Sequence, residues 1–358
     1  MKRRESVKVR TTPKGSVRTL AAFLFLSLVR GPLVNAQGFT VAALPDTQSY
    51  VQSDELATGF LAQTKWIRDN AEAENIRFVT QLGDIVSHGG QGDDGNRAEW
   101  RRADAAMSVL DSTDVPWGVA VGNHELDRVD VLGSGYTRFR EFFGPRTTGR
   151  FADKPWFGGS SESELNSFQL FSAGGRDYLF LHLELDIPDD AIAWARDVLA
   201  AHPKRATIVS THIYLGQRFP APYLPGPGRN SREEMFAKLV APLRQIFLVL
   251  NGHDGSEMHN VSVNDYGGEV FELLQDYAGR PHGGDGWTRL LRIDEAAGEI
   301  RIETFTPGVP HNPSPRFEYD ENSEFTFKLD FAARFDTPLA GPLPPPETVT
   351  VDDFNSDT

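Results

Sequence analysis

Apolar runs alternate with amphipathic segments along the first 250 residues of the chain. Five stretches have the continuous apolar character of strands buried on both faces: residues 39–44, 76–82, 115–121, 206–210 and 246–250. Four stretches repeat apolar positions every three or four residues, which predicts helices: residues 55–73, 97–111, 189–202 and 232–245. This alternation predicts an α/β protein with stacked βαβ units and a mainly parallel sheet.

The other segments carry weaker patterns. Residues 125–165 are polar and rich in glycine, so we expect loops there, whereas residues 167–186 predict a hairpin that turns at Gly174-Gly175. Short β-rich segments follow at residues 268–275, 288–294, 299–305 and 316–331. We expect one domain over residues 37–334 and a disordered tail, acidic and rich in proline, over residues 335–358.

The first 36 residues have a different pattern. Basic side chains precede an apolar run at residues 20–29, and Val34-Asn35-Ala36 fits the small-residue rule for a cleavage site. The run is too short to span a bilayer, which needs about 20 apolar residues. Residues 1–36 therefore predict a signal peptide. We expect export to the periplasm or the extracellular space, with no stable membrane association after cleavage.

Composition narrows the class of protein. Hydrophobic residues make up 39% and charged residues 24% of the 358 residues, as in soluble globular proteins. The formal net charge of -14 argues against a nucleic-acid partner, because phosphate backbones are bound by Lys and Arg. The absence of cysteine excludes disulfides, thiolate metal sites and cysteine nucleophiles.

Polar clusters follow the five apolar strands directly. They are Asp46-Thr47-Gln48, Gly83-Asp84, Gly122-Asn123-His124-Glu125, Thr211-His212 and Asn251-Gly252-His253-Asp254. Each cluster alone is more typical of a turn or a hydrogen-bonded loop than of a site. Because ligands bind beyond the carboxyl ends of parallel strands, however, we expect all five to meet at one edge. Their carboxylate, amide and imidazole groups, without sulfur, suit Mn, Zn, Fe or Mg.

The order of these clusters resembles the calcineurin-like metallophosphoesterase superfamily. More narrowly, Pro45 to Gln48 resembles the Pro-Asp-Thr-Gln motif of a bacterial exported branch, and residues 273–277, 283–290 and 304–307 are also similar. The resemblance covers residues 39–331. It implies a four-layer αββα sandwich, in which two packed mixed sheets are flanked by helices. It also implies hydrolysis of phosphoesters at two divalent metal ions, by attack of a metal-bridging hydroxide.

The resemblance further implies roles for single residues. His124 is expected above the site, where it stabilises or protonates the leaving oxygen, and Glu125 and Asp127 are both candidates to orient it. Asp84 is expected to be catalytic as the bridge between the two metals. The other implied metal ligands are Asn123, His212 and His253 at the second site, and Asp46 and Gln48 at the first.

Two positions depart from the family pattern, and both weaken the first metal site. Gln48 stands where many members have histidine, and Gly255 ends a motif that often reads Gly-His-x-His. The first site could hold a labile Mn, Mg or Ca, could be empty, or could recruit another side chain. The candidates for recruitment are Asp254, Glu257, His259 and His282.

We favour a two-metal centre with a weak first ion. The expected function is then an exported metal-dependent phosphoesterase acting on small phosphate esters. The alternative is a non-catalytic relative that binds a metal or a ligand. The sequence leaves open whether the substrate is a monoester, a diester or a pyrophosphate, and it leaves the oligomeric state open.

Overall fold

The computed structural model describes residues 38–92, 94–216 and 222–337 of the chain. The predicted signal peptide and residues 338–358 of the predicted tail lie outside these residues. Among the described residues, no helix combines the length and the apolar character that crossing a membrane requires.

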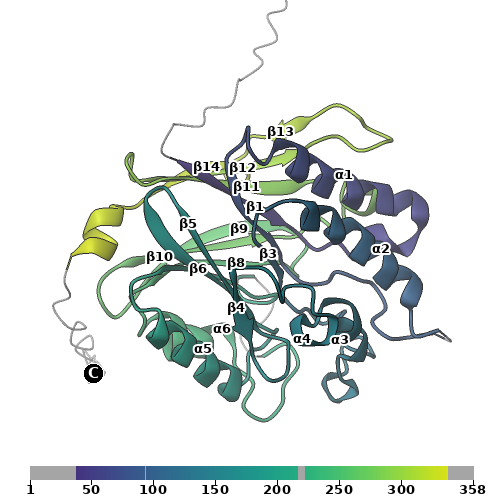
Figure 1. The fold of residues 1–358 in the computed structure, drawn as a ribbon, viewed down its shortest axis with the longest axis horizontal. Helices are drawn as coiled ribbons and strands as arrows, with labels where there is room; N and C mark the ends of the chain where they lie inside the picture. Colours follow the sequence, from purple (N-terminus) through teal and green to yellow (C-terminus); the bar gives the residue numbers. More distant parts are fainter. Residues whose placement is uncertain (1–37, 93, 217–221, 338–358) are drawn as a thin grey trace, which may run out of the picture. The chain divides into compact units, whose positions relative to one another are not determined.

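Two mixed β-sheets form the centre of the described structure (Figure 1). The first sheet contains, in spatial order, β13 (Arg316–Glu318), β12 (Glu299–Thr306), β11 (Thr288–Asp294), β1 (Phe39–Leu44), β2 (Ile76–Gln81) and β3 (Trp117–Val119), with β14 (Glu324–Lys328) paired to β12. Only β1, β2 and β3 run parallel to one another. The other pairs in this sheet are antiparallel.

The second sheet has the same mixed character. It contains, in spatial order, β4 (Phe157–Ser160), β5 (Ser167–Ala173), β6 (Arg176–His182), β7 (Ala206–Ser210), β8 (Ile246–Asn251), β10 (Glu269–Gln275) and β9 (Glu257–Val263). The strands from β6 to β10 are parallel, and the pairs at both ends are antiparallel. The expected mainly parallel sheet is therefore wrong in detail, since parallel strands form only one end of the first sheet and the middle of the second.

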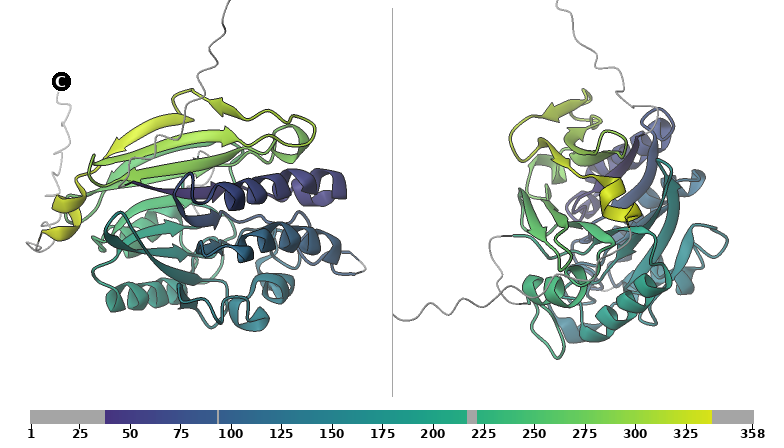
Figure 2. Two further views of the ribbon diagram at one scale, coloured as in Figure 1. Left: turned by 45° about the horizontal axis from the view of Figure 1, so that its top comes forward. Right: turned by 90° about the vertical axis from the view of Figure 1, so that its left-hand side faces the viewer.

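The sheets pack face to face and carry helices on their outer faces. Phe78 of β2 stacks on Phe180 of β6 with ring centroids 4.2 Å apart, within the apolar layer between the sheets. Helices α1 (Asp54–Asn70) and α2 (Arg97–Met107) pack on the first sheet, and α5 (Asp189–Ala201) packs on the second. Figure 2 shows α1 (purple) and α5 (teal) on different sides of the strands. The expected four-layer αββα sandwich is confirmed.

Several expected elements differ in the structure. The segment 125–165, expected to be loop, contains α3 (Thr137–Phe143), α4 (Pro145–Thr148) and β4, because Phe139 and Phe143 are buried against the first sheet's outer core. The helix expected at 232–245 is a single α-helical turn, α6 (Arg232–Met235), followed by a π-helical turn. Strand β9 was not predicted, since its side chains are half-exposed and show no apolar alternation.

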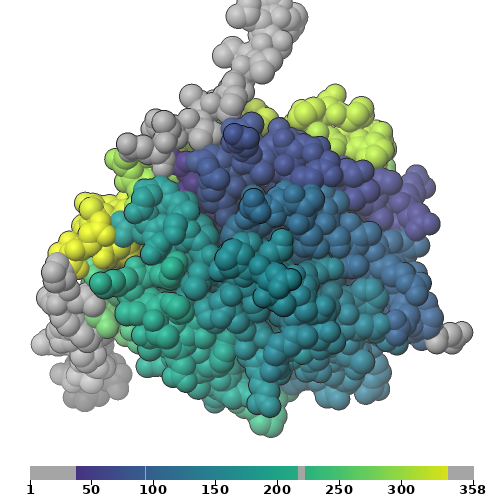
Figure 3. Space-filling model, viewed as in Figure 1, coloured from purple at the N-terminus to yellow at the C-terminus, as the bar shows by residue number. Residues whose placement is uncertain are grey.

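The described structure continues past residue 334, where the predicted tail begins. A helical turn at Ala332–Asp336, yellow in Figure 3, lies against the second sheet. The ring of Phe335 packs on Phe247 of β8 at 5.6 Å, and Asp336 pairs with Arg176 of β6 at 2.7 Å.

Candidate metal centre

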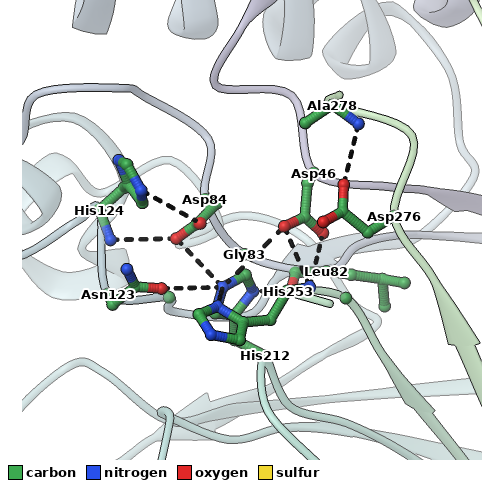
Figure 4. Close-up of polar contacts among 12 residues, drawn as sticks. Asp46, Leu82, Gly83, Asp84, Asn123, His124, His212, His253, Asp276 and Ala278 are labelled. Atoms are coloured by element: carbon green, nitrogen blue, oxygen red, sulfur yellow. Dashed lines mark hydrogen bonds and ion pairs between the residues drawn. The ribbon is translucent and has the colours of Figure 1, made fainter. Parts of the chain in front are cut away.

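The carboxyl ends of five strands, from both sheets, meet at one place (Figure 4). The loops after β1, β2 and β3 carry Asp46, Asp84 and Asn123, and the loops after β7 and β8 carry His212 and His253. The polar clusters therefore converge as the sequence indicated. They do so where two sheets face each other, rather than along the edge of a single sheet.

His212 lies at the centre of this group. Its Nδ1 donates to the Leu82 carbonyl at 2.9 Å, which leaves Nε2 facing the other side chains. Nε2 lies 3.2 Å from Oδ1 of Asp84 and 3.1 Å from Oδ1 of Asn123. It also lies 3.2 Å from Nδ1 of His253. Four potential ligand atoms thus gather around one point, a donor set that fits a divalent cation without sulfur ligands.

Charge at this point is compensated by a proton. Burial alone would lower the pKa of His212, but the carboxylates of Asp84 and Asp46 outweigh burial and raise it to about 10. The pKa of Asp84 is lowered despite burial, because the imidazoles of His212 and His124 lie beside it. Burial, together with the charge of His212, lowers the pKa of His253 to about 4, so His253 is neutral and its Nδ1 can act as a ligand.

Glu125 connects two loops of the centre through hydrogen bonds to their backbones. Its buried carboxylate accepts from the backbone N–H of Asp84 at 2.8 Å, of Ile85 at 2.7 Å and of Gly122 at 2.6 Å. These bonds join the loop after β2 to the loop after β3. Glu125 therefore positions the backbone that carries Asp84 and Asn123.

His124 is oriented by a backbone carbonyl. Its Nδ1 donates to the Ser87 carbonyl at 2.6 Å, and its Nε2 lies 3.8 Å from Oδ2 of Asp84. Neither residue proposed to orient this ring does so through a hydrogen bond. Glu125 binds the backbone, and the Asp127 carboxylate accepts from the Thr137 backbone N–H at the start of α3 at 2.9 Å. The Nε2 of His124 remains directed to the candidate centre.

Two glycines let the loops approach the carboxylates closely. A Cβ on Gly122 would lie 2.2 Å from Oδ1 of Asp84, and a Cβ on Gly252 would lie 1.9 Å from Oδ1 of Asp46. Asp84 itself has φ 51° and His253 has φ 79°, which are left-handed conformations that side-chain-bearing residues rarely adopt. Such strain concentrates at functional sites.

The part of the centre around Asp46 is built differently. The Asp46 carboxylate accepts from the backbone N–H of His253 at 3.1 Å, and Gln48 Nε2 lies 3.4 Å from Oδ2 of Asp84. Figure 4 shows the carboxylates of Asp46 and Asp276 facing each other. Burial, reinforced by the charge of Asp276, raises the pKa of Asp46 well above its usual range. Among the described residues, the buried Oε1 of Gln48 has no hydrogen-bond partner.

Asp276 was not predicted, and it lies where a recruited ligand was expected. Its two oxygens accept from the backbone N–H of Gly255 at 2.7 Å and of Ala278 at 2.8 Å. Gly255, where the family resemblance led us to expect histidine, thus donates its backbone N–H to a carboxylate that directly follows strand β10. The only sequence signal was its place directly after an apolar β segment.

Three of the four candidates for recruitment are engaged elsewhere. Glu257 pairs with Arg289 at 2.7 Å, the ring of His259 stacks on Phe325, and His282 contacts Asp285. The fourth, Asp254, lines a pocket beside His253.

Asp130 and Tyr223 complete the surroundings of Asn123. Oδ1 of Asp130 accepts from Asn123 Nδ2 at 2.8 Å and from the Tyr223 hydroxyl at 3.1 Å. Because the amide N of Asn123 is bound there, its Oδ1 points to His212. The ring of Tyr223 packs edge-to-face on His253 at 4.6 Å. Neither residue was predicted, since Asp130 lies in a polar segment expected to be loop and Tyr223 lies in a segment rich in proline and glycine.

The chain matches the family model for calcineurin-like phosphoesterases over residues 39–257. A curated relative, the uncharacterized protein YvnB of Bacillus subtilis (strain 168), is 34% identical over 306 residues, which is 83% of this chain. The chain spans only 22% of the length of that relative.

Solved structures show a similar fold at low sequence identity. A dimetal phosphatase from Danio rerio aligns with a TM-score of 0.50 and 13% identity, covering 81% of this chain and 99% of its own. GAP50, the anchor in the inner membrane complex of Plasmodium, aligns with a TM-score of 0.46 and 13% identity, covering 82% of this chain and 88% of its own.

Proposed function

The chain belongs to the calcineurin-like phosphoesterase family, and on that premise we propose that it hydrolyses small phosphate esters at two divalent cations held by the candidate metal centre. The observation that carries the proposal is the gathering of ligand atoms around Nε2 of His212. In the metal-free chain a proton on Nε2 of His212 holds these atoms together, and a divalent cation would take the place of that proton.

The residues present fit such cations on both sides of the centre. We assign Asp84, Asn123, His212 and His253 to one cation. Asp46, Gln48 and Asp84 hold the other, with Asp276 as an added carboxylate. The unpartnered Oε1 of Gln48 and the facing carboxylates of Asp46 and Asp276 are the groups that a hard cation would satisfy. When bound, the two cations supply an activated water and neutralise charge on the phosphate.

His124 has the second task in the reaction. Its Nδ1 is fixed on the Ser87 carbonyl, so a proton on Nε2 faces the candidate metal centre. We propose that this proton goes to the leaving oxygen as the ester bond breaks. Both the bridging position, Asp84, and the acid position, His124, are in place, which favours an enzyme over a binding protein.

We also propose that the protein is exported. The basic residues, the apolar run and the cleavage pattern within residues 1–36 support secretion to the periplasm or the extracellular space. The Pro-Asp-Thr-Gln motif at Pro45 to Gln48 supports membership of the exported branch of the family.

Removal of the bridging carboxylate tests this function. We expect Asp84→Asn to lower turnover of a chromogenic monoester or diester in Mn²⁺ by about 10³-fold or more, since a metal centre contributes several kcal/mol to the barrier. The matched control is Asp114→Asn, an exposed aspartate before β3, which should leave turnover unchanged. Wild-type protein that is folded and metal-loaded but hydrolyses no monoester or diester would contradict the proposal.

A further inference from the structure

A second group of metal-ligating side chains lies apart from the candidate metal centre. His282, Asp285 and His311 place one ligand atom each within 4.8 Å of one another. Nδ1 of His282 and Nε2 of His311 both lie 2.8 Å from the same oxygen of Asp285, its Oδ1. The two imidazole rings have their centroids 3.6 Å apart. None of these three residues contributes a side chain to the centre around His212.

The group joins two loops at the edge of the first sheet. His282 and Asp285 precede β11, and His311 follows β12. Because β11 pairs antiparallel with β1, both loops leave the sheet at the carboxyl end of β1, where Asp46 and Gln48 begin. The loop before β11 also touches this segment, since the Gly286 backbone N–H donates to the Tyr50 hydroxyl at 2.7 Å.

The backbone of this loop is held in an unusual conformation. His282 has φ 55° and Asp285 has φ 48°, so two side-chain-bearing residues of one short loop are left-handed. Strain of this kind persists where the surroundings fix the side chains and is concentrated at ligand sites. Here it directs both side chains to a common point with His311.

Another acidic group nearby serves as a contrast. Glu257, Glu318 and Asp320 also lie close together, but arginines neutralise them: Glu257 pairs with Arg289 at 2.7 Å, and Glu318 with Arg280 at 2.7 Å. Around Asp285 the nearest arginine, Arg316, lies 3.9 Å from the other oxygen, Oδ2. The oxygen shared by the two imidazoles therefore faces nitrogen atoms that can become metal ligands.

We propose that His282, Asp285 and His311 bind a third divalent cation of the borderline transition-metal class, Zn²⁺ foremost. Each neutral imidazole would present the ring nitrogen that now donates to Asp285, after its proton moves to the other ring nitrogen. With metal–ligand bonds of about 2.0–2.1 Å, each of the two nitrogen–oxygen distances, now 2.8 Å, would have to open by about half an ångström. His282 and His311 are partly exposed and can move by that amount.

The bound cation would fasten the two loops to each other. Three protein ligands leave a fourth position for water. Since the same loop contacts Tyr50, which follows Gln48 closely, the cation would stabilise the segment that carries the weaker part of the candidate metal centre. This site goes beyond the proposed function, because it needs neither the centre nor the reaction.

Zinc binding by the untagged chain tests the site. We would measure Zn²⁺ per chain by equilibrium dialysis at pH 7.5 in a His212→Ala background, so that the count does not depend on an intact candidate centre. We expect His311→Ala to lose one equivalent of Zn²⁺. The affinity should fall by about 100-fold or more, since even outer-shell partners cost 10–100-fold. The control is His202→Ala, a histidine at the end of α5, which should keep that equivalent.

Thermal melting provides a second measurement, which shows whether the substitution itself disturbs folding. Zn²⁺ should raise the melting temperature of the His212→Ala chain, and this rise should disappear in His212→Ala/His311→Ala while the melting temperature in chelator stays within about 2 °C, as for an exposed substitution. Equal zinc counts and equal thermal shifts with and without His311 would overturn the proposal. Activity of the wild-type chain is not involved, so failure of this site and failure of the proposed function are distinguishable.

Discussion

The two halves of the candidate metal centre, one around His212 and one around Asp46, differ in how their polar groups are satisfied. Around His212, the ligand atoms are neutral or compensated, and they are fixed by hydrogen bonds to Leu82, Asp130 and the backbone. Around Asp46, two buried carboxylates face each other, and an amide oxygen of Gln48 lacks a partner among the described residues. The first half is satisfied by the proton of His212, whereas the second leaves buried oxygen atoms that a proton or a cation would satisfy.

This difference bears on the two positions, Gln48 and Gly255, where the family resemblance led us to expect histidine. In our proposal, oxygen donors from Gln48 and Asp276 serve there, and such donors suit harder cations such as Mn²⁺ or Mg²⁺. We therefore expect the cation at Asp46 to bind more weakly than the cation at His212, and to control when the centre is active.

Substitution of Gly122 or Gly252 should distinguish the two halves of the centre most strongly. In Gly122→Ala, the new Cβ would lie 2.2 Å from Oδ1 and 2.7 Å from the backbone N of Asp84, the residue that we assign to both proposed cations. We expect loss of turnover by about 10³-fold or more, not restored by excess Mn²⁺. Steady-state kinetics across a Mn²⁺ series would measure it.

Gly252→Ala is the matched change in the other half. Its Cβ would meet Oδ1 of Asp46 at 1.9 Å, so only the weaker cation should be lost. We expect a loss of about 10–100-fold that excess Mn²⁺ partly restores, as for other disturbed ligands. Gly133→Ala, where a Cβ would meet no atom within 4 Å, is the control for both. Equal, Mn²⁺-insensitive losses in both variants would contradict the division into two unequal halves.

Removing the metals should make stability depend on pH through His212. Its pKa is raised to about 10 in the folded chain, against about 6.5 when unfolded. The raised pKa stabilises the metal-free fold fully below about pH 6.5, and this contribution is lost as pH rises through 10. From pH 7 to 9 the melting temperature of chelator-treated protein should fall by about 5 °C more than that of Mn²⁺-loaded protein.

His212→Gln supplies the control for this pH dependence. Without the imidazole, the metal-free melting temperature should lose the extra slope between pH 7 and 9. A slope that persists in His212→Gln would assign the pH dependence to another group.

Substitution at Gln48 should produce the smallest change. Gln48→His returns the imidazole that many relatives have, and we expect tighter binding of the weaker cation, by about 10-fold, as for one improved interaction of about 1.4 kcal/mol. The concentration of Mn²⁺ that gives half-maximal turnover measures this. Asp276→Asn should shift that concentration in the opposite direction, because it removes a charge that faces Asp46. A shift in the same direction for both would show that Asp276 does not support this cation.

The sequence predicted those parts of the fold that depend on continuous apolar runs. Strands β1 and β7 have the predicted bounds, because their side chains are buried throughout. Strand β9 and helix α3 were missed, since an exposed edge strand and a short aromatic helix acquire their structure from tertiary contacts.

The residues of the candidate site also fall into those that the sequence predicted and those that it did not. Side chains that directly follow buried strands, such as Asp84 and His212, were recognised from local order along the chain. Asp276 and Asp130 were not, because their place beside Asp46 and Asn123 is set by contacts between loops distant in sequence. The position of Glu125 was noticed, but its bonds to three backbone N–H groups could not be read from spacing.

The most direct test of a two-cation phosphoesterase with unequal halves is a Mn²⁺ titration that records binding and turnover together. The His311→Ala chain would be used, so that the proposed third site does not contribute. We predict two binding steps of different affinity, with hydrolysis of a chromogenic phosphoester rising as the weaker step fills. A single tightly bound Mn²⁺ and no hydrolysis of monoester or diester at saturation would contradict the account.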